Sequence, residues 1–270
     1  MIQTLRRRAT IYGAMAAIVP KVFMAYTLWF WVSLILNTIG MTILVFFWRV
    51  VYGNTDSLGG LSLQTTLTYI LLAQVFLPLA DQDLIWEFGY NLREGGMVHA
   101  LLRPVDFQLG YYAQALMRLA TQLLLQLPMA LVATLVFGLR WPADPAAWGA
   151  FVVSALLGYT SLFFFHWCIA CLTFYTTEVW GLGVIIFGTS LFFSGSLMPL
   201  AIMPGWLRTL VLSLPFAQSL AIPMSFLSGI TPVADALHVW LSQLIWLIGL
   251  GVLSRLIFRV AVRKITVQGG

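Results

Sequence analysis

Six long apolar stretches dominate this chain of 270 residues and limit what it can fold into. Each is close to or above the roughly 20 residues that a helix needs to cross about 30 Å of hydrocarbon. Their apolar character is continuous rather than alternating, which is typical of membrane helices and not of the strands of a membrane barrel. The sequence therefore predicts an all-α polytopic membrane protein, with six transmembrane helices in one domain over residues 1–270. The stretches lie near residues 23–48, 61–80, 109–138, 148–174, 179–198 and 236–258.

The composition supports this class. Only 9% of the residues are charged and 61% are hydrophobic, with a mean hydropathy of +0.94. An average soluble domain carries about 25% charged residues, so this chain could not cover its apolar surface in water. A net charge of +5 would suggest nucleic acid binding in a soluble protein. Here it is better explained by membrane orientation, and we expect no nucleic acid partner.

The basic residues are divided unequally between the two predicted sides of the membrane. If both termini are cytoplasmic, ten of the 14 basic residues lie on that side, and only Arg49, Arg140 and Arg208 lie outside or near the outer boundary. This bias follows the positive-inside rule and predicts a multi-pass protein of the inner or plasma membrane. The ten are Arg6, Arg7, Arg8, Lys21, Arg93, Arg103, Arg255, Arg259, Arg263 and Lys264.

The first 21 residues are basic and then mixed, and they are not long enough in apolar residues to form a span. Ile11, Tyr12, Met15 and Ile18 could form one apolar face of a helix that ends at Pro20-Lys21. Such a helix would lie on the inner leaflet of the bilayer with its cations among the lipid headgroups. The alternative is a disordered basic tail. The cations of this segment are Arg6, Arg7, Arg8 and Lys21.

Residues 81–106, DQDLIWEFGYNLREGGMVHALLRPVD, form a charged segment between the second and third stretches. They hold seven of the 23 charged residues and are too many for a simple turn between two membrane helices. This segment predicts a cytoplasmic region that contacts a soluble partner. Two alternatives remain: a solvated loop that only sets orientation, and a proton-transfer pair formed by Asp83 and Glu87, which are four residues apart.

Residues 199–229 form the other irregular region, which is interrupted by four prolines. The sequence PGWLRTLVLSL at 204–214 begins with a proline, which is favourable in the first turn of a helix, but it is too short to cross. Two short helices that enter the outer leaflet partway would fit this pattern, provided that protein covers their ends.

This layout resembles the permease subunit of type-2 ABC exporters. The sequence REGGMVHALLRPVDF at 93–107 is similar to a cytoplasmic signature of one branch, and FFSGSLMPLAIMPGWLRTLVLSLPF at 192–216 is similar to the exit of the fifth span and the outer re-entrant hairpin. The resemblance implies a second permease, identical or related, and two ABC ATP-binding subunits that bind ATP and Mg. The chain has no G-x-x-x-x-G-K-[ST] phosphate loop, so we expect no ATPase site, cofactor or metal in it.

The resemblance also implies roles for particular residues. The charged segment would be a coupling helix that contacts the ATPase through Glu87, Arg93, Glu94 and Arg103. Glu178, which follows the fourth span, would either contact the ATPase or cap the fifth span, where a negative charge suits the helix N-terminus.

The first, second and fifth spans surround the transport route in the permeases that this chain resembles. Candidates for the route on these spans are Asn37, Gln74, Thr189 and Ser194. Arg118 is a further candidate, because Gln114, Arg118, Gln122 and Gln126 recur every four residues on one face of the third span. For all of them, hydrogen bonding and packing between helices is the alternative interpretation.

The leading hypothesis is therefore a permease that exports an amphipathic small molecule, a lipid or a glycolipid when partner subunits hydrolyse ATP. An ion-coupled carrier would need carboxylates in the middle of the membrane, whereas the nine acidic residues lie at predicted helix ends or in loops. A membrane enzyme that acts on a lipid-linked substrate would need a cluster of acids, histidines or a metal at one face.

Overall fold

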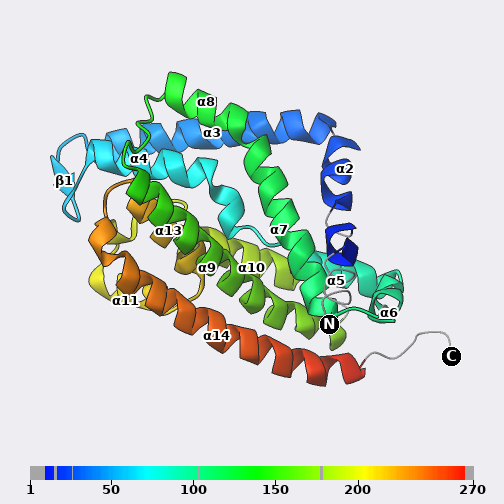
Figure 1. The fold of residues 1–270 in the computed structure, drawn as a ribbon. Helices are drawn as coiled ribbons and strands as arrows, with labels where there is room; N and C mark the ends of the chain where they lie inside the picture. Colours follow the sequence, from blue (N-terminus) through cyan, green and yellow to red (C-terminus); the bar gives the residue numbers. More distant parts are fainter. Residues whose placement is uncertain (1–9, 15–16, 26, 103, 177–178, 265–270) are drawn as a thin grey trace.

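The computed structural model describes residues 10–14, 17–25, 27–102, 104–176 and 179–264. Their regular structure is helical apart from a small antiparallel hairpin of β1 (Ser57–Leu58) and β2 (Leu61–Ser62) (Figure 1). The α-helices are α2 (Ile18–Ala25), α3 (Thr27–Val51), α4 (Leu63–Val75), α5 (Leu84–Arg93), α6 (Gly96–Leu101), α7 (Phe107–Leu125), α8 (Leu127–Leu135), α9 (Pro145–Ala170), α10 (Val179–Phe193), α11 (Gly205–Leu212), α12 (Phe216–Ser219), α13 (Ala221–Leu227) and α14 (Ala236–Ala261). Short 3-10 helices are η1 (Leu77–Ala80), η2 (Cys171–Phe174), η3 (Leu200–Ile202), η4 (Val233–Asp235) and η5 (Val262–Lys264).

Four helices are long and apolar enough to cross a membrane within the described residues, namely 30–51, 107–135, 145–174 and 233–264. They correspond to the first, third, fourth and sixth predicted spans. A bent pair, 205–212 with 216–227, could raise the number to five. The architecture is thus an all-helical membrane protein with four to five candidate spans by length and composition.

The second and fifth predicted spans differ from the expected long helices. The second becomes α4, of 13 residues, followed after Phe76 by η1, which has a proline near its start. The fifth becomes α10, of 15 residues, and soon after it Gly195 adopts a left-handed backbone with φ of 81°. Proline removes a helical hydrogen bond, and a residue in the left-handed conformation ends a helix. The length of the apolar stretch alone therefore overestimated the length of both helices.

Two other boundaries also differ from the sequence pattern. The third predicted span bends at Gln126, where α7 ends and α8 begins with a proline in its first turn. At the N-terminus, α2 continues through Pro20 and Lys21 instead of ending there. Pro20 is the third residue of α2, a position where the missing N–H has no helical acceptor to lose. Residues 10–14 are also helical, whereas Arg6, Arg7 and Arg8 lie outside the described residues.

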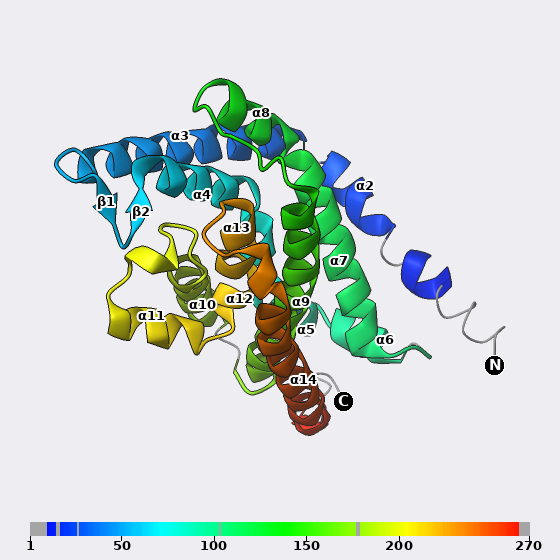
Figure 2. The same cartoon turned by 60° about the vertical axis from the view of Figure 1, so that its left-hand side comes forward.

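Several short elements lie at two opposite ends of the molecule, and long helices run between these ends (Figures 1 and 2). One end holds α5, α6 and the last turns of α14, where Arg255 forms a 2.7 Å ion pair with Asp106. The β1–β2 hairpin, η3 and α11 lie at the other end. There the turn residue Gly59 has a positive φ of 57°, and a Cβ on it would overlap the carbonyl oxygen of Ala201. Only glycine suits this close approach.

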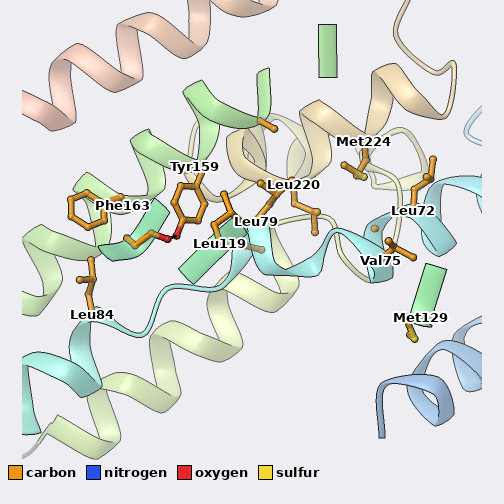
Figure 3. Packing of buried hydrophobic residues seen from close by; sticks show 14 of the residues in the cluster. Leu72, Val75, Leu79, Leu84, Leu119, Met129, Tyr159, Phe163, Leu220 and Met224 are labelled. Atoms are coloured by element: carbon orange, nitrogen blue, oxygen red, sulfur yellow. Dashed lines mark hydrogen bonds between the residues drawn. The ribbon is translucent and has the colours of Figure 1, made fainter. Parts of the chain in front are cut away.

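The core is built around α9, the most deeply buried of the long helices. Tyr159 of α9 is 2% exposed and donates a 2.9 Å hydrogen bond to the carbonyl oxygen of Ala115 in α7. Figure 3 shows Tyr159 among apolar side chains that include Leu79 and Leu119. On another side of α9, a Cβ on Gly158 would overlap the carbonyl oxygen of Gln218 in α12. The absent side chain thus lets the backbones of α9 and α12 approach closely.

Candidate functional site

The charged segment 81–106 folds as two short helices at one end of the molecule (Figure 1). α5 ends at Arg93, and Gly95 follows with φ of 71°, a left-handed conformation that glycine adopts without strain. α6 then leads to Asp106, whose carboxylate accepts a 2.8 Å hydrogen bond from the N–H of Leu109 and caps α7. The expected helix in this segment is therefore present, and a glycine divides it.

An aromatic cluster fixes α5 to the long helices. Phe88 is fully buried, and its ring centroid lies 5.2 Å from that of Tyr111 on α7 and 5.0 Å from that of Trp167 on α9. Such edge-to-face pairs are favourable beyond the area that they bury. Asn91 of α5 adds a 3.0 Å hydrogen bond to the hydroxyl of Tyr111. These contacts join α5 to α7 and α9 as one packed unit.

Two glycines bring α5 against α10. A Cβ on Gly89 of α5 would lie 2.6 Å from the side chain of Val179. A Cβ on Gly183 of α10 would overlap the indole ring of Trp86. Each glycine thus leaves room for a side chain of the other helix, so that the two helices interlock.

Arg118 of α7 reaches the acidic face of α5. Its guanidinium donates a 2.8 Å hydrogen bond to Glu87 and lies 3.7 Å from the carboxylate of Asp83. The side chains of Arg118 and Glu87 are each only 23% exposed. The spacing of Asp83 and Glu87 on one helical face is apparent in the sequence, but their partner Arg118, 31 residues after Glu87, is not.

The other residues predicted to contact a partner are differently placed. Arg93 and Glu94 are exposed at the end of α5, and Lys21 is exposed on α2. Arg103 and Glu178 lie outside the described residues. Glu87 therefore faces α7, whereas Arg93 and Glu94 face solvent.

A cavity of about 970 Å³ lies between α3, η1, α7 and α10, close to Arg118. Its wall is mostly apolar and includes Phe30, Leu34, Leu124 and Phe187. A smaller cavity of about 300 Å³ shares part of this wall and extends to α5 and α9. The polar residues of the larger cavity are Ser33, Asn37, Asp81, Thr121, Gln122, Gln126 and Ser190.

Asp81 is the one charged residue in the described wall of the larger cavity. It follows η1, just after the second predicted span. Burial raises the pKa of Asp81 to about 7, and the negative charge of Asp83 acts in the same direction, while Arg118 opposes both. Near pH 7 the carboxyl group is therefore present in both its neutral and its charged form, and it is charged at higher pH.

The five residues predicted for the transport route separate into two groups. Asn37 lines the cavity, and Arg118 is near Asp81 without lining it. Gln74 donates to the carbonyl of Ser196, Thr189 to that of Ile185 and Ser194 to that of Leu191, and none of these three lines the cavity.

The sequence patterns missed Asp81 and Ser190 as cavity residues. Ser190 follows Thr189 directly, so the choice between them depended on the rotation of α10, which the uniformly apolar sequence does not reveal. Asp81 was assigned to the charged segment because it directly follows Ala80, the last residue of the second predicted span.

Comparison with known proteins gives one family. The model of the family described as ABC-2 family transporter protein matches residues 36–269, which is most of the chain. No curated protein and no solved structure shows a significant match. The family match spans the charged segment, most of the cavity wall and the long helices from the middle of α3 onward. The chain therefore belongs to the ABC-2 transporter family, as a multi-pass membrane protein of the permease type.

Proposed function

We propose that this protein is the permease subunit of an ATP-driven exporter. It moves an amphipathic small molecule, a lipid or a glycolipid outward when two ABC ATP-binding subunits, which hold ATP and Mg, close together and hydrolyse ATP. The observation that carries this proposal is the attachment of α5 to α7, α9 and α10 at once. A helix held in this way can pass the movement of a soluble partner into the membrane helices as a rigid body.

The ATP-binding subunit docks on the exposed side of α5 and α6. Tyr90 is 61% exposed and Leu102 is 77% exposed, and both accompany the exposed charges of Arg93 and Glu94. Aromatic and arginine side chains contribute strongly to protein interfaces. The opposite side of α5 is occupied by its own helices, so this surface is the one available to a partner.

Movement of α5 reaches the cavity by two routes. Arg118 joins α5 to α7, whose next turn contributes Gln122 to the cavity wall. Trp86 meets Gly183 on α10, which contributes Phe187 and Ser190. A displacement of α5 would therefore move two walls of the cavity and change its access.

The chain crosses the membrane six times, with both termini in the cytoplasm. α4 with η1 and the short α10 complete the set of crossings, and α11–α13, bent by 76°, form a re-entrant hairpin at the outer face. The grouping of α5, α6 and the end of α14 at one end, and of β1, β2 and α11 at the other, supports this orientation (Figure 1). Lys21 then lies near the inner headgroups on an interfacial helix.

A second permease chain, identical or related, completes a complex of two permeases and two ATP-binding subunits. Native mass spectrometry of the complex tests this composition. A mass that corresponds to one permease for two ATP-binding subunits would contradict it.

The test of the function uses the permease purified with the ATP-binding subunit encoded beside it. The double variant Arg93→Glu and Glu94→Lys should weaken assembly or make ATP hydrolysis insensitive to the permease, because it inverts the exposed charges of α5. Arg208→Glu, on exposed α11 at the opposite end, is the matched control and should behave as wild type.

Failure to bind any ATP-binding subunit would overturn the ATP-driven function. Substrate movement driven by an ion gradient in liposomes without such a subunit would support the carrier alternative instead.

A further inference from the structure

The charges around the cavity between α3, η1, α7 and α10 limit the class of ligand that it can bind. We propose that it binds an amphipathic organic cation, with Asp81 as the counter-ion and the apolar wall as the site for the rest of the molecule. This inference rests on the proposed function only in so far as the bound cation is the exported substrate. The binding itself can be measured on the permease alone.

The charges around the cavity favour a cation. No lysine, arginine or histidine belongs to the wall of the larger cavity in the described part of the chain. Arg118, the nearby base, already contacts Glu87 at 2.8 Å and Asp83 at 3.7 Å. Three carboxylates therefore accompany one guanidinium, and Asp81 has no ion pair among the described residues.

The shape and wall of the cavity suit an amphipathic molecule. Its volume of about 970 Å³ is at the upper end of the range for sites that bind drug-sized ligands. Phe30 and Phe187 belong to the same wall as Asp81, and aromatic faces attract organic cations. Leucines from α3, η1, α7 and α10 provide the surface for apolar groups. A compact, hydrophilic cation would leave this surface without a partner.

An anionic ligand would fit poorly for the same physical reasons. Its charge would lie against Asp81 in a region of low dielectric constant, where repulsion between like charges is stronger than in water. No cation in the described wall could offset this repulsion. The polar side chains Asn37, Gln122 and Gln126 can orient a ligand by hydrogen bonds, but they cannot balance a full negative charge.

Two ions of nearly equal size and shape but opposite charge test the proposal. Binding of tetraphenylphosphonium and of tetraphenylborate is measured by equilibrium dialysis on the full-length permease in discs of zwitterionic lipid, with empty discs subtracted. The wild type should bind the phosphonium saturably and at least tenfold more tightly than the borate. Tighter binding of the borate, or equal binding of both ions, would overturn the proposal.

Variants then locate the binding. Asp81→Asn should weaken phosphonium binding about tenfold or more, whereas Asp56→Asn, which makes the same chemical change in the exposed turn at the opposite end, should leave it unchanged. Asn37→Asp places a second carboxylate in the same wall and should tighten binding. Because this variant predicts a gain, it tests the site even if Asp81→Asn folds poorly. Unchanged affinity in a folded Asp81→Asn variant, or a loss of affinity in Asn37→Asp, would contradict the assignment.

The outcomes also separate this inference from the proposed function. If the ATP-binding subunit assembles and hydrolyses ATP but the permease shows no preference for the phosphonium, the inference is overturned and the function stands. If the phosphonium binds through Asp81 but no ATP-binding subunit assembles, the site stands and the ATP-driven function is overturned.

Discussion

Arg118 of α7 and Glu87 of α5 form a 2.8 Å ion pair that joins the charged segment to a long membrane helix. Both side chains are largely removed from solvent, so the pair is screened less than a surface salt bridge. Because α5 holds this contact on one side and presents Arg93 and Glu94 on the other, the pair lies between the proposed docking surface and the cavity.

This pair should contribute to both stability and coupling. Glu87→Gln and Arg118→Gln should each lower the free energy of unfolding by about 1–3 kcal/mol, since each leaves a partly buried charge without its full set of partners. Equilibrium unfolding in mixed micelles provides the measurement. In a double-mutant cycle the coupling energy should be about 0.5–3 kcal/mol, as expected for residues in contact.

The same variants should also reduce the effect of substrate on ATP hydrolysis in the assembled complex. Strictly additive effects on stability, together with normal stimulation of ATP hydrolysis by substrate, would contradict this prediction. They would show that Glu87 and Arg118 are not energetically coupled and do not transmit the effect of substrate.

The contact of Trp86 with Gly183 should be sensitive to a single methyl group. Gly183→Ala forces the ring of Trp86 to move, which should cost about 1–3 kcal/mol as overpacking and shift α5 away from α10. We expect a lower melting temperature and weaker coupling of ATP hydrolysis to substrate. Gly181→Ala is the matched control on the same helix, since a Cβ there meets no atom within 4 Å. Equal behaviour of the two variants would contradict the proposed interlocking.

The close approach of α9 and α12 should be essential for folding. Gly158→Ala places a methyl group on the carbonyl oxygen of Gln218, and backbone cannot give way as a flexible side chain can. The yield of monodisperse protein should fall severely. Gly149→Ala, also on α9 but in open space, should be tolerated or mildly stabilising because alanine favours a helix. Size-exclusion profiles of both variants check this, and a normal profile for Gly158→Ala would contradict it.

The Asp106–Arg255 pair predicts an acid-sensitive contact at the end that holds α5 and α6. Desolvation acts to raise the pKa of Asp106, but the hydrogen bond from Arg255 and the one from the N–H of Leu109 outweigh it, so the folded pKa lies below the ordinary value of 3.8. A carboxyl group whose pKa is lower in the folded state stabilises the fold at every pH above its pKa in the unfolded state. This stabilisation is lost as the pH falls through the pKa of the folded state.

Asp106→Asn should therefore reduce stability at neutral pH and flatten its dependence on pH below about 5. Thermal unfolding across this range, compared with Asp144→Asn, gives the measurement. Asp144 caps α9 in the same way but has no basic partner in the described residues. A pH profile of Asp106→Asn that is identical to that of the wild type would exclude the effect.

Cation binding in the cavity should depend on pH near neutrality. Because the pKa of Asp81 is raised to about 7, its carboxyl group is neutral below this pH and charged above it. Affinity for tetraphenylphosphonium should rise as pH increases through about 7 and then level off, and Asp81→Asn should remove this rise. A pH-independent affinity of the wild type would contradict it. The other titratable or charged groups near Asp81 are Asp83 and Glu87 on α5, Arg118 on α7, and Tyr159 and His166 on α9.

The all-helical class and most of the long helices follow from the sequence, because uninterrupted apolar length is a direct requirement of the bilayer. The helix in the charged segment was expected from its charge, its length and the family resemblance. The structure adds that its apolar residues Leu84, Ile85 and Phe88 are buried, which the sequence analysis had not used. The breaks in the second and fifth spans were not predicted. They depend on the backbone conformations at Pro78 and Gly195. Proline and glycine also occur within unbroken membrane helices, so their presence in the sequence does not predict a break.

The candidate site was harder to predict than the fold. A polar stripe on the third span was visible, but the ion pair of Arg118 joins residues that are distant in sequence. The cavity depends on the rotation of α10 and on the position of η1, which tertiary packing decides. Sequence patterns thus indicated the segments that contribute to the candidate site. The particular side chains could be identified only from the contacts between helices.

In the proposed complex, an ATP-binding subunit docks on α5 and α6. Cysteine crosslinking in the purified complex tests it most directly, because the native Cys168 and Cys171 are both buried. A short bifunctional maleimide should link Glu94→Cys to a cysteine on the ATP-binding subunit, whereas Asp56→Cys at the opposite end should give no product. A complex that co-purifies but crosslinks only through Asp56→Cys, or through neither position, would contradict this account.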